Sequence, residues 1–268
     1  MGQKKIIVVG DGVGAWCLLF ELAKLDNLEI IQIASNSFFG PCSFSTTSIN
    51  CLRGTNRGLS PLGDLLCDSY QTFEDFYKNN SPNGIYPGNE VQFWDENSSH
   101  SKRYPNFTKT KDHKVYSDMA KFEFFHENQA YFINPKKLGE WFHRQFDNSI
   151  KQTSENVLSI ESGILITDKN EYNYDKVFVC TNSKSQALLA GKNPKFDYYI
   201  EHSKSVSGSY LECKLEDYIL PFESNINLAL EKHHFIYRYD DKLIQIGSTT
   251  DNKCLIAVSY THLRAHET

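Results

Sequence analysis

The stretch KKIIVVGDGVGA, from Lys4 to Ala15, joins an apolar run to three closely spaced glycines and then enters a helical pattern. The apolar positions that follow keep the 3.6-residue period of one helix face: Trp16, Leu19, Phe20 and Ala23. A second apolar run, residues 28–33, follows at the distance that a βαβ unit requires. The stretch therefore predicts the first strand, turn and helix of a dinucleotide-binding unit.

The chemistry of dinucleotide binding explains why the residues of this turn are small. Gly10 lets the chain turn sharply off the strand, and Gly12 removes a side chain where a pyrophosphate must approach the backbone. Ala15 lets the helix pack close to the sheet. The pyrophosphate would lie on the helix N-terminus, where unpaired N–H groups and the helix dipole favour an anion. The alternative is a glycine turn in an α/β protein that binds no nucleotide.

One expected part of such a site is missing. An Asp or Glu normally hydrogen-bonds the ribose roughly 20 residues beyond the glycines, but Ala34 stands at that position. Ser35 or Asn36 could bind the ribose less strongly. No Arg follows until Arg53, which disfavours a cofactor with a 2′-phosphate. The loss weakens the case for NAD more than that for a flavin dinucleotide, because the flavin cofactor is held along its whole length.

Composition excludes some partners. The chain has 268 residues, of which 40% are hydrophobic and 23% charged, and a formal net charge of −5. The acidic balance, with no basic stripe, argues against nucleic acid and anionic membranes. The N-terminal apolar run is too short for a signal peptide or a membrane span. The seven cysteines are scattered and lack a C-x-x-C pair, which predicts reduced thiols in a cytoplasmic protein.

The last residues of the chain, 258–268, look like the in-frame translation of a sequencing adapter. We therefore expect the natural sequence to stop near Ala257, with its own C-terminus lost. The polar side chains His262, Arg264 and His266 are left out of every site argument for this reason.

Helical and loop patterns follow the opening unit. Residues 38–60 are rich in Ser, Thr and Asn and predict either a functional loop that donates to phosphates or a surface loop. One helix is expected over 61–78. Its apolar face would consist of Leu62, Leu65, Leu66, Phe73, Phe76 and Tyr77. Another helix starts at Asn134-Pro135, with Asn at the N-cap and Pro at the first helical position.

Strand patterns fill most of the remainder. They are expected at 91–94, 121–126, 130–133, 157–160, 164–167, 176–182, 205–213, 226–230, 234–239 and 243–248. Residues 176–182 are typical of a buried strand in a parallel sheet. His233 and His234 are adjacent, so in a strand they point to opposite faces and cannot bind one metal ion together. His126 has no partner at metal spacing, and we expect no metal site.

The order of these segments resembles that of the flavin-dependent D-amino-acid oxidase and glycine oxidase family. The resemblance covers most of residues 4–257. Besides the glycine turn and the hydroxyl-rich loop, it rests on Tyr131–Pro135, Asp175–Asn182, Phe235–Arg238 and Ile246–Thr249. It implies an α/β fold in which a Rossmann-like FAD-binding domain is interleaved with a mainly antiparallel β-sheet substrate domain.

The resemblance also implies a division of the chain. The FAD-binding domain would comprise residues 1–80 and 130–190, and the substrate domain residues 81–129 and 191–257, with the adapter-like tail at 258–268. The Arg that binds the substrate carboxylate in the family usually comes after the strand that contains Gly247. We therefore expect a truncated chain, which lacks part of its substrate site.

FAD would lie extended across the glycine turn, the loop after the second strand and the strand that ends near Thr181. The contacts that the resemblance implies are Gly10, Gly12, Gly14 and Ala15 in the turn, Ser35 at the ribose, Thr46 and Thr47 at the phosphates and ribityl chain, Val157 at the adenine, and Thr181 near the cofactor. The usual Gly after the Thr is Asn182, the residue other than Gly that best tolerates a positive φ.

Such an enzyme would oxidise a C–N bond of a small amine or amino acid by hydride transfer to FAD, which dioxygen or another acceptor would reoxidise. Arg238 and Arg53 are the candidates for binding a substrate carboxylate, with Tyr237 beside Arg238, and an exposed Arg on a strand edge is the alternative. Two other functions stay open. One is the flavin module of a tRNA-modifying oxidoreductase, and the other is a cofactor-free binding or scaffold protein.

Overall fold

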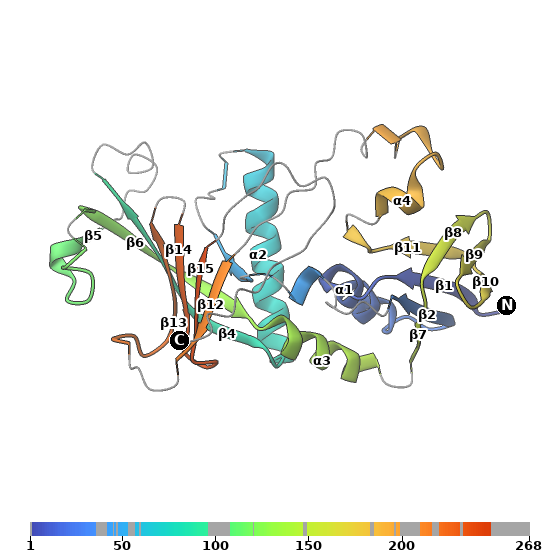
Figure 1. Cartoon of the computed structure of the whole chain (residues 1–268), viewed down its shortest axis with the longest axis horizontal. Helices are drawn as coiled ribbons and strands as arrows, with labels where there is room; N and C mark the ends of the chain where they lie inside the picture. Colours follow the sequence, from blue (N-terminus) through green and yellow to red (C-terminus); the bar gives the residue numbers. More distant parts are fainter. Residues whose placement is uncertain are drawn as a thin grey trace, which may run out of the picture. The chain divides into compact units, whose positions relative to one another are not determined.

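The computed structural model describes fourteen segments of the chain. They are residues 2–35, 42–44, 46, 48–52, 57–58, 60–95, 108–119, 121–146, 149–182, 185–195, 197–198, 210–215, 220–230 and 233–247. These residues fall into two compact units (Figure 1). Unit 1 takes the described residues within Met1–Thr46 and Pro135–Ser207, and unit 2 those within Thr47–Asn134 and Gly208–Thr250. The domain boundaries expected at 80, 130 and 190 stay a prediction, and the described residues of 61–80 belong to unit 2.

Unit 1 is built on a parallel sheet with the strand order β11-β1-β2-β7. Its strands are β1 (Lys4–Val9), β2 (Leu28–Ala34), β7 (Ile150–Ser154) and β11 (Lys176–Val179). The apolar runs of β1 and β2 are buried because further elements cover both faces of this sheet. The predicted strand–turn–helix–strand opening is confirmed. Strand β11 is parallel as predicted, but it lies at the edge of the sheet and is only half-buried.

Two helices cover one face of this sheet, α1 (Val13–Leu22) and α3 (Pro135–Phe146). They pack tightly, because a Cβ atom on Gly139 would lie 2.9 Å from the indole of Trp16. The ring of Trp16 stacks on Phe142, with centroids 6.1 Å apart. Helix α3 starts at the predicted Pro135, and its Leu138, Phe142 and Phe146 are buried, whereas Trp141 is half-buried.

A small antiparallel sheet covers the other face. It consists of β8 (Val157–Glu161), β9 (Ile164–Thr167) and β10 (Glu171–Asn173). A buried apolar cluster joins it to the parallel sheet, formed by Ile7, Val9, Ile31, Ile33, Ile160 and Leu165. Alternate residues of β2 therefore point away from this cluster, among them Gln32 and Ala34. The short helix α4 (Ser185–Leu189) also belongs to unit 1, and its Leu188 packs against the same cluster.

Unit 2 contains a larger sheet with the order β12-β15-β14-β13-β4-β6-β3, and β5 pairs with β6. The strands are β3 (Ile49–Cys51), β4 (Ile85–Trp94), β5 (Thr108–Lys109), β6 (Phe124–Ile133), β12 (Tyr210–Lys214), β13 (Asn225–Leu230), β14 (His233–Arg238) and β15 (Leu243–Gly247). All the pairs are antiparallel except β13 with β4, so the sheet is mainly antiparallel as predicted.

Three predicted strands have different bounds in the structure. Residues 121–126 and 130–133 belong largely to the single strand β6, and β4 begins at Ile85, six residues before the expected start at 91. Pro87 and Gly88, residue types that disfavour strands, both lie inside β4. Pairing with β13 begins only at Gly88, so no residue of β13 pairs with Pro87. At Gly88 a Cβ atom would lie 2.3 Å from the carbonyl oxygen of Asn225.

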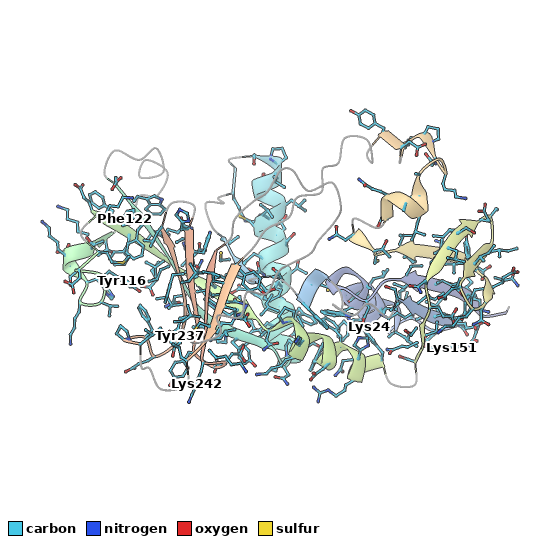
Figure 2. All side chains as sticks on the ribbon, viewed as in Figure 1. Lys24, Tyr116, Phe122, Lys151, Tyr237 and Lys242 are labelled. Carbon is cyan, nitrogen blue, oxygen red and sulfur yellow. The ribbon has the colours of Figure 1, made fainter. Side chains whose placement is uncertain are left out.

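The two faces of this sheet differ in character. One face holds an apolar cluster that includes Tyr116, Phe122 and Tyr237 (Figure 2). The residues of the opposite face include six buried polar side chains: Glu90, Gln92, Asn225, Asn227, Arg238 and Gln245. Such groups stay buried only when they are hydrogen-bonded, so this face carries a polar layer. The same face also holds a small buried apolar cluster of Ala130, Phe132 and Ile236.

Helix α2 (Pro61–Asn80) begins with Ser60, whose hydroxyl accepts from the Gly63 N–H at 3.0 Å. Its predicted apolar face was wrong in the first half: Leu62, Leu65 and Leu66 are 64%, 60% and 45% exposed. The packing lies in the second half, where Tyr70, Phe73 and Tyr77 surround the ring of Tyr131 on β6. Two 3-10 turns complete the described elements, η1 (Cys42–Phe44) and η3 (Thr110–Asp112).

Candidate functional site

The glycine turn leaves β1 with a geometry that only glycine adopts easily. Gly10 has a φ of 128°, and its N–H donates to the carbonyl oxygen of Ile33 at 2.8 Å. A Cβ atom there would lie 2.4 Å from the carbonyl oxygen of Cys180, which follows β11. Gly10 therefore packs the turn against the neighbouring strand, and this is a structural requirement that needs no ligand.

The N-terminus of α1 presents unpaired donors. The Val13 N–H donates to Ser43 Oγ at 3.0 Å, and the Trp16 N–H donates to the Gly12 carbonyl at 3.0 Å. Within the described ranges no acceptor pairs with the N–H groups of Gly14 and Ala15, and the first turn has no acidic residue. A Cβ atom on Gly14 would meet nothing within 4 Å. The helix end is therefore open to an anion.

Ser43 adds a hydroxyl to this helix end. Its oxygen lies 3.1 Å from where a Cβ atom on Gly12 would stand, so it closely flanks the turn. Because the oxygen already accepts from Val13, the O–H can still donate to an oxyanion. The sequence pointed to Thr46 and Thr47 in this loop and not to Ser43 in particular. Thr46 is half-buried in unit 1, and Thr47 lies outside the described residues.

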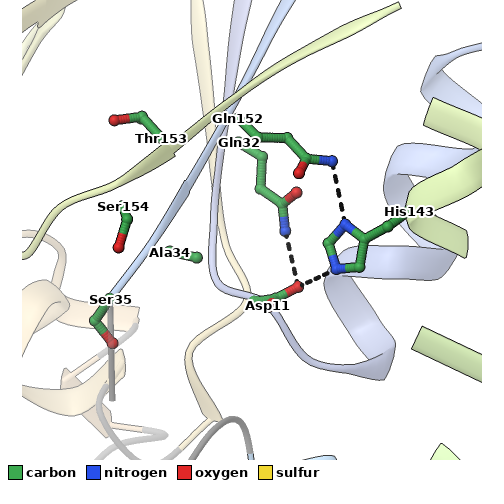
Figure 3. A pocket seen from close by; sticks show the side chains of 8 residues that line it. All are labelled: Asp11, Gln32, Ala34, Ser35, His143, Gln152, Thr153 and Ser154. Carbon is green, nitrogen blue, oxygen red and sulfur yellow. Dashed lines mark hydrogen bonds and ion pairs between the residues drawn. The ribbon is translucent and has the colours of Figure 1, made fainter. Parts of the chain in front are cut away.

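A cavity of about 300 Å³ opens beside the turn, beyond the carboxyl ends of β1, β2 and β7 (Figure 3). The residues that line it are Asp11, Gln32, Ala34, Ser35, His143, Gln152, Thr153 and Ser154. The carboxyl ends of parallel strands are where α/β sheets bind their ligands. Of the cofactor contacts expected from the sequence, Ser35 lies in this cavity, next to Ala34.

Asp11 is the centre of a hydrogen-bond network in the cavity wall. Its Oδ1 accepts from Gln32 Nε2 at 3.2 Å and from His143 Nε2 at 3.0 Å (Figure 3). The same oxygen accepts from Trp16 Nε1 at 2.8 Å. Burial raises the pKa of Asp11, but the hydrogen bonds from His143, Trp16 and Gln32 outweigh this effect and lower it below the ordinary value. The carboxylate is therefore ionised at neutral pH.

His143 lies between two polar neighbours in the cavity wall. Its Nε2 faces the Asp11 carboxylate and must carry a proton to donate. Its Nδ1 lies 3.1 Å from Gln152 Nε2. The imidazole ring therefore links the Asp11 carboxylate to Gln152 on β7. The sequence did not predict the pair of His143 and Asp11, because 132 residues separate the two side chains.

Gln32 carries an unpaired acceptor. The residue is 1% exposed, and its Nε2 donates to the Gly10 carbonyl at 3.0 Å as well as to Asp11. Both partners are acceptors, so they fix which end of the amide is the nitrogen. The oxygen Oε1 then has no partner within the described part of the chain. An unpaired buried acceptor lowers folding stability by about 1–3 kcal/mol. A ligand that donates a hydrogen bond to Oε1 would therefore bind favourably at this wall of the cavity.

Two further predicted contacts lie elsewhere in unit 1. Thr181 follows β11, and its Oγ1 is 3.0 Å from Ser185 Oγ. Asn182 adopts the left-handed conformation with a φ of 51°, as expected for a residue in place of Gly. Val157 lies on β8 and packs against the cluster on the far face of the parallel sheet. Their contacts with FAD stay predictions.

In unit 2, Arg238 lies on β14, between β13 and β15. It is 3% exposed, and it donates from Nη1 to the Ile133 carbonyl at 2.6 Å and from Nε to Gln245 Oε1 at 3.1 Å. The alternative of an exposed Arg on a strand edge was therefore wrong. Tyr237, its neighbour in the strand, packs in the apolar cluster on the opposite face. The catalytic roles of both residues stay predictions, and the other candidate, Arg53, lies outside the described residues.

Comparison with known proteins gives the fold and nothing finer. No protein-family model and no curated protein sequence matches the chain. The structure is similar to glycine oxidase from Geobacillus kaustophilus, with a TM-score of 0.70, 13% identity, and coverage of 97% of this chain and 75% of that one. For glycine oxidase from Bacillus cereus the TM-score is 0.70 and the identity 14%, with coverage of 95% of this chain and 73% of that one. For FAD-bound L-alpha-glycerophosphate oxidase from Mycoplasma pneumoniae the TM-score is 0.65 and the identity 9%, with coverage of 93% of this chain and 72% of that one. The chain has the glycine oxidase-like flavoprotein fold that the sequence predicted.

Proposed function

We propose that this chain, which has the fold of the glycine oxidases, is an FAD-dependent oxidoreductase that oxidises a C–N bond of a small amine or amino acid. One observation carries the proposal. In this fold, the start of α1 presents two unpaired N–H groups beside a polar cavity at the carboxyl ends of β1, β2 and β7. This arrangement suits a dinucleotide, with its anionic pyrophosphate and its polar ribose.

The residues present fit FAD at its pyrophosphate. The N–H groups of Gly14 and Ala15 and the hydroxyl of Ser43 would hold the phosphate oxygens. Ser35 would lie near the ribose, and Asn182 would keep the turn beyond Thr181 that the fold needs. When bound, FAD supplies the hydride-accepting chemistry, and dioxygen or another acceptor would reoxidise it.

The substrate side of the proposal rests on unit 2. The polar layer of the large sheet contains Arg238, whose guanidinium is already fixed by Ile133 and Gln245. A fixed guanidinium is suited to orient a carboxylate, and Arg238 is our candidate for that role. The chain would then hold the substrate amine in its neutral form for hydride loss, without an obligatory protein base.

A cytoplasmic location belongs to the same proposal. Five cysteines within the described ranges are free thiols: Cys17, Cys51, Cys67, Cys180 and Cys213. Reduced thiols are usual in reducing compartments. Among the helices within the described ranges, none combines the length and the apolar character that a membrane crossing requires.

The visible spectrum of the purified chain tests the cofactor. We expect flavin absorbance bands in the protein as isolated or after addition of FAD and gel filtration. A panel of small amines and amino acids, followed by bleaching of the flavin bands without oxygen, then tests the reaction. A protein that stays colourless after FAD is added would contradict the proposal. That result would favour a cofactor-free binding protein, for which the missing acid at Ala34 is the supporting observation.

A further inference from the structure

We propose that Asp11 performs the ribose-binding task that the absent acid at position 34 would perform, with Gln32 as a second acceptor. The inference rests on the proposed dinucleotide function and names the residues that would bind its ribose. Asp11 stands inside the glycine turn, where its side chain has no role in the phosphate contacts described above. Its place in the cavity is what makes it a ligand candidate.

Strand register brings Asp11 beside position 34. Val9 on β1 pairs with Ile33 on β2, so Gly10 and Asp11 leave the sheet next to Ala34 and Ser35. Asp11 and Ala34 both line the cavity. A carboxylate on the turn can therefore serve the same space as a carboxylate at the end of β2, and the methyl side chain of Ala34 leaves that space open.

The Asp11 carboxylate is built as a binding group. Three donors fix Oδ1, namely Trp16, Gln32 and His143, and the side chain is still 32% exposed. Within the described residues Oδ2 has no hydrogen-bond partner. A side chain that is both fixed and partly open loses little conformational entropy when a ligand hydroxyl donates to it.

Gln32 gives independent support. Its Oε1 is a buried acceptor without a partner in the described part of the chain, and the residue lines the same cavity as Asp11. A vicinal diol has two O–H groups, and it can donate one to each of two neighbouring acceptors. The pair of Asp11 and Gln32 therefore matches a ribose, whereas a 2′-phosphate would bring a second anion against Asp11.

The test compares ADP with 2′,3′-dideoxy-ADP by isothermal titration calorimetry on the full chain. We expect the native chain to bind ADP at least roughly tenfold more tightly, because a hydrogen bond to a charged group is lost in the dideoxy ligand. D11N should lose most of this preference, because only the Gln32 acceptor then remains for the ribose hydroxyls. D26N is the matched control, since Asp26 carries the same charge on an exposed turn of unit 1 and should leave the preference intact.

One further variant and one further ligand complete the test. In the double variant D11N/A34E the carboxylate returns to the end of β2, and we expect the preference for ADP to return with it. IDP keeps the ribose hydroxyls but lacks the adenine amino group. Its affinity relative to ADP therefore tests whether the cavity binds the base. A native chain that discriminates against IDP but not against dideoxy-ADP would overturn the inference, because the cavity would then bind the base.

The outcomes separate this inference from the proposed function. If the native chain binds FAD and ADP but D11N keeps the full preference for ADP, the role of Asp11 is wrong and the proposed function stands. If the native chain binds neither FAD nor ADP, the proposed function fails together with the inference. Circular dichroism of D11N checks that the variant is folded, and the comparison of two ligands on the native chain needs no variant at all.

Discussion

At Gly10 the protein tolerates no side chain. The φ of 128° is a conformation that L-residues rarely adopt, and a Cβ atom would lie 2.4 Å from the Cys180 carbonyl oxygen. We expect G10A to lower the free energy of unfolding by at least about 2 kcal/mol, measured by urea denaturation. G14A is the matched control, because its Cβ would meet nothing within 4 Å and alanine favours the helix. Equal stabilities of the two variants would contradict this view of the turn.

Glu155 makes unit 1 sensitive to acid. Burial raises its pKa, but hydrogen bonds from Thr153, Thr167, Tyr172 and Asn170 overcome this and lower the pKa to about 2. The carboxylate therefore ionises more readily in the folded chain than in the unfolded chain, where its ordinary pKa is 4.5. Its stabilising effect is complete above pH 4.5 and disappears as the pH falls through 2.

We expect E155Q to lower the free energy of unfolding at pH 7 by roughly 1–3 kcal/mol, since Gln cannot accept from all four donors. The variant should also lose less stability than the native chain between pH 4.5 and 2, as followed by circular dichroism. E171Q, on the exposed side of β10, is the control and should behave as the native chain does. An unchanged acid profile in E155Q would show that another group governs it.

At the scale of elements, the contact of α1 with α3 supports the nucleotide turn. Phe142 is 1% exposed and touches Trp16, which in turn holds Asp11. We expect F142A to lower the free energy of unfolding by about 3–5 kcal/mol, because it leaves a cavity between the helices. E140A in the same helix should change it by less than about 0.5 kcal/mol, since Glu140 is exposed. Thermal denaturation of both variants makes the comparison.

The elements that sequence reasoning predicted well carry local signals. The apolar run before Gly10 and the Asn134-Pro135 helix start depend on neighbouring residues, and both were confirmed. The errors occurred where distant packing decides the outcome. Leu65 has the period of a buried helix position, but only the second half of α2 packs on Tyr131. The Asp11–His143 contact was missed for the same reason.

At the scale of the whole molecule, ligand binding and stability are linked. A cofactor that binds only the folded chain stabilises it by mass action, by about 2.7 kcal/mol at a hundredfold excess over Kd. We expect FAD to raise the melting temperature of the native chain in proportion to the logarithm of its concentration. D11N should show a smaller rise at equal FAD concentrations, measured by differential scanning calorimetry. A melting temperature that does not respond to FAD would contradict the proposed cofactor.

The topology was harder to predict than its parts. The parallel pairing of Gly88 with Asn225 puts β4 beside a strand far along the chain, and no periodicity in either segment indicates that partnership. The resemblance to the oxidase family predicted a second, mainly antiparallel sheet, and the structure confirms it. Sequence patterns alone do not show which segments form each unit, because both units take residues from separate parts of the chain.

The position of β1 at the centre of its sheet has a consequence for biosynthesis. Strand β1 leaves the ribosome before one of its two partners, β11, which begins only at Lys176. At a translation rate of roughly 5–20 residues per second, that edge of β1 waits on the order of ten seconds for its partner. During this interval the nascent chain displays an apolar strand with an open edge. A chaperone that shields it would act on the growing polypeptide and would have no target once β11 is in place.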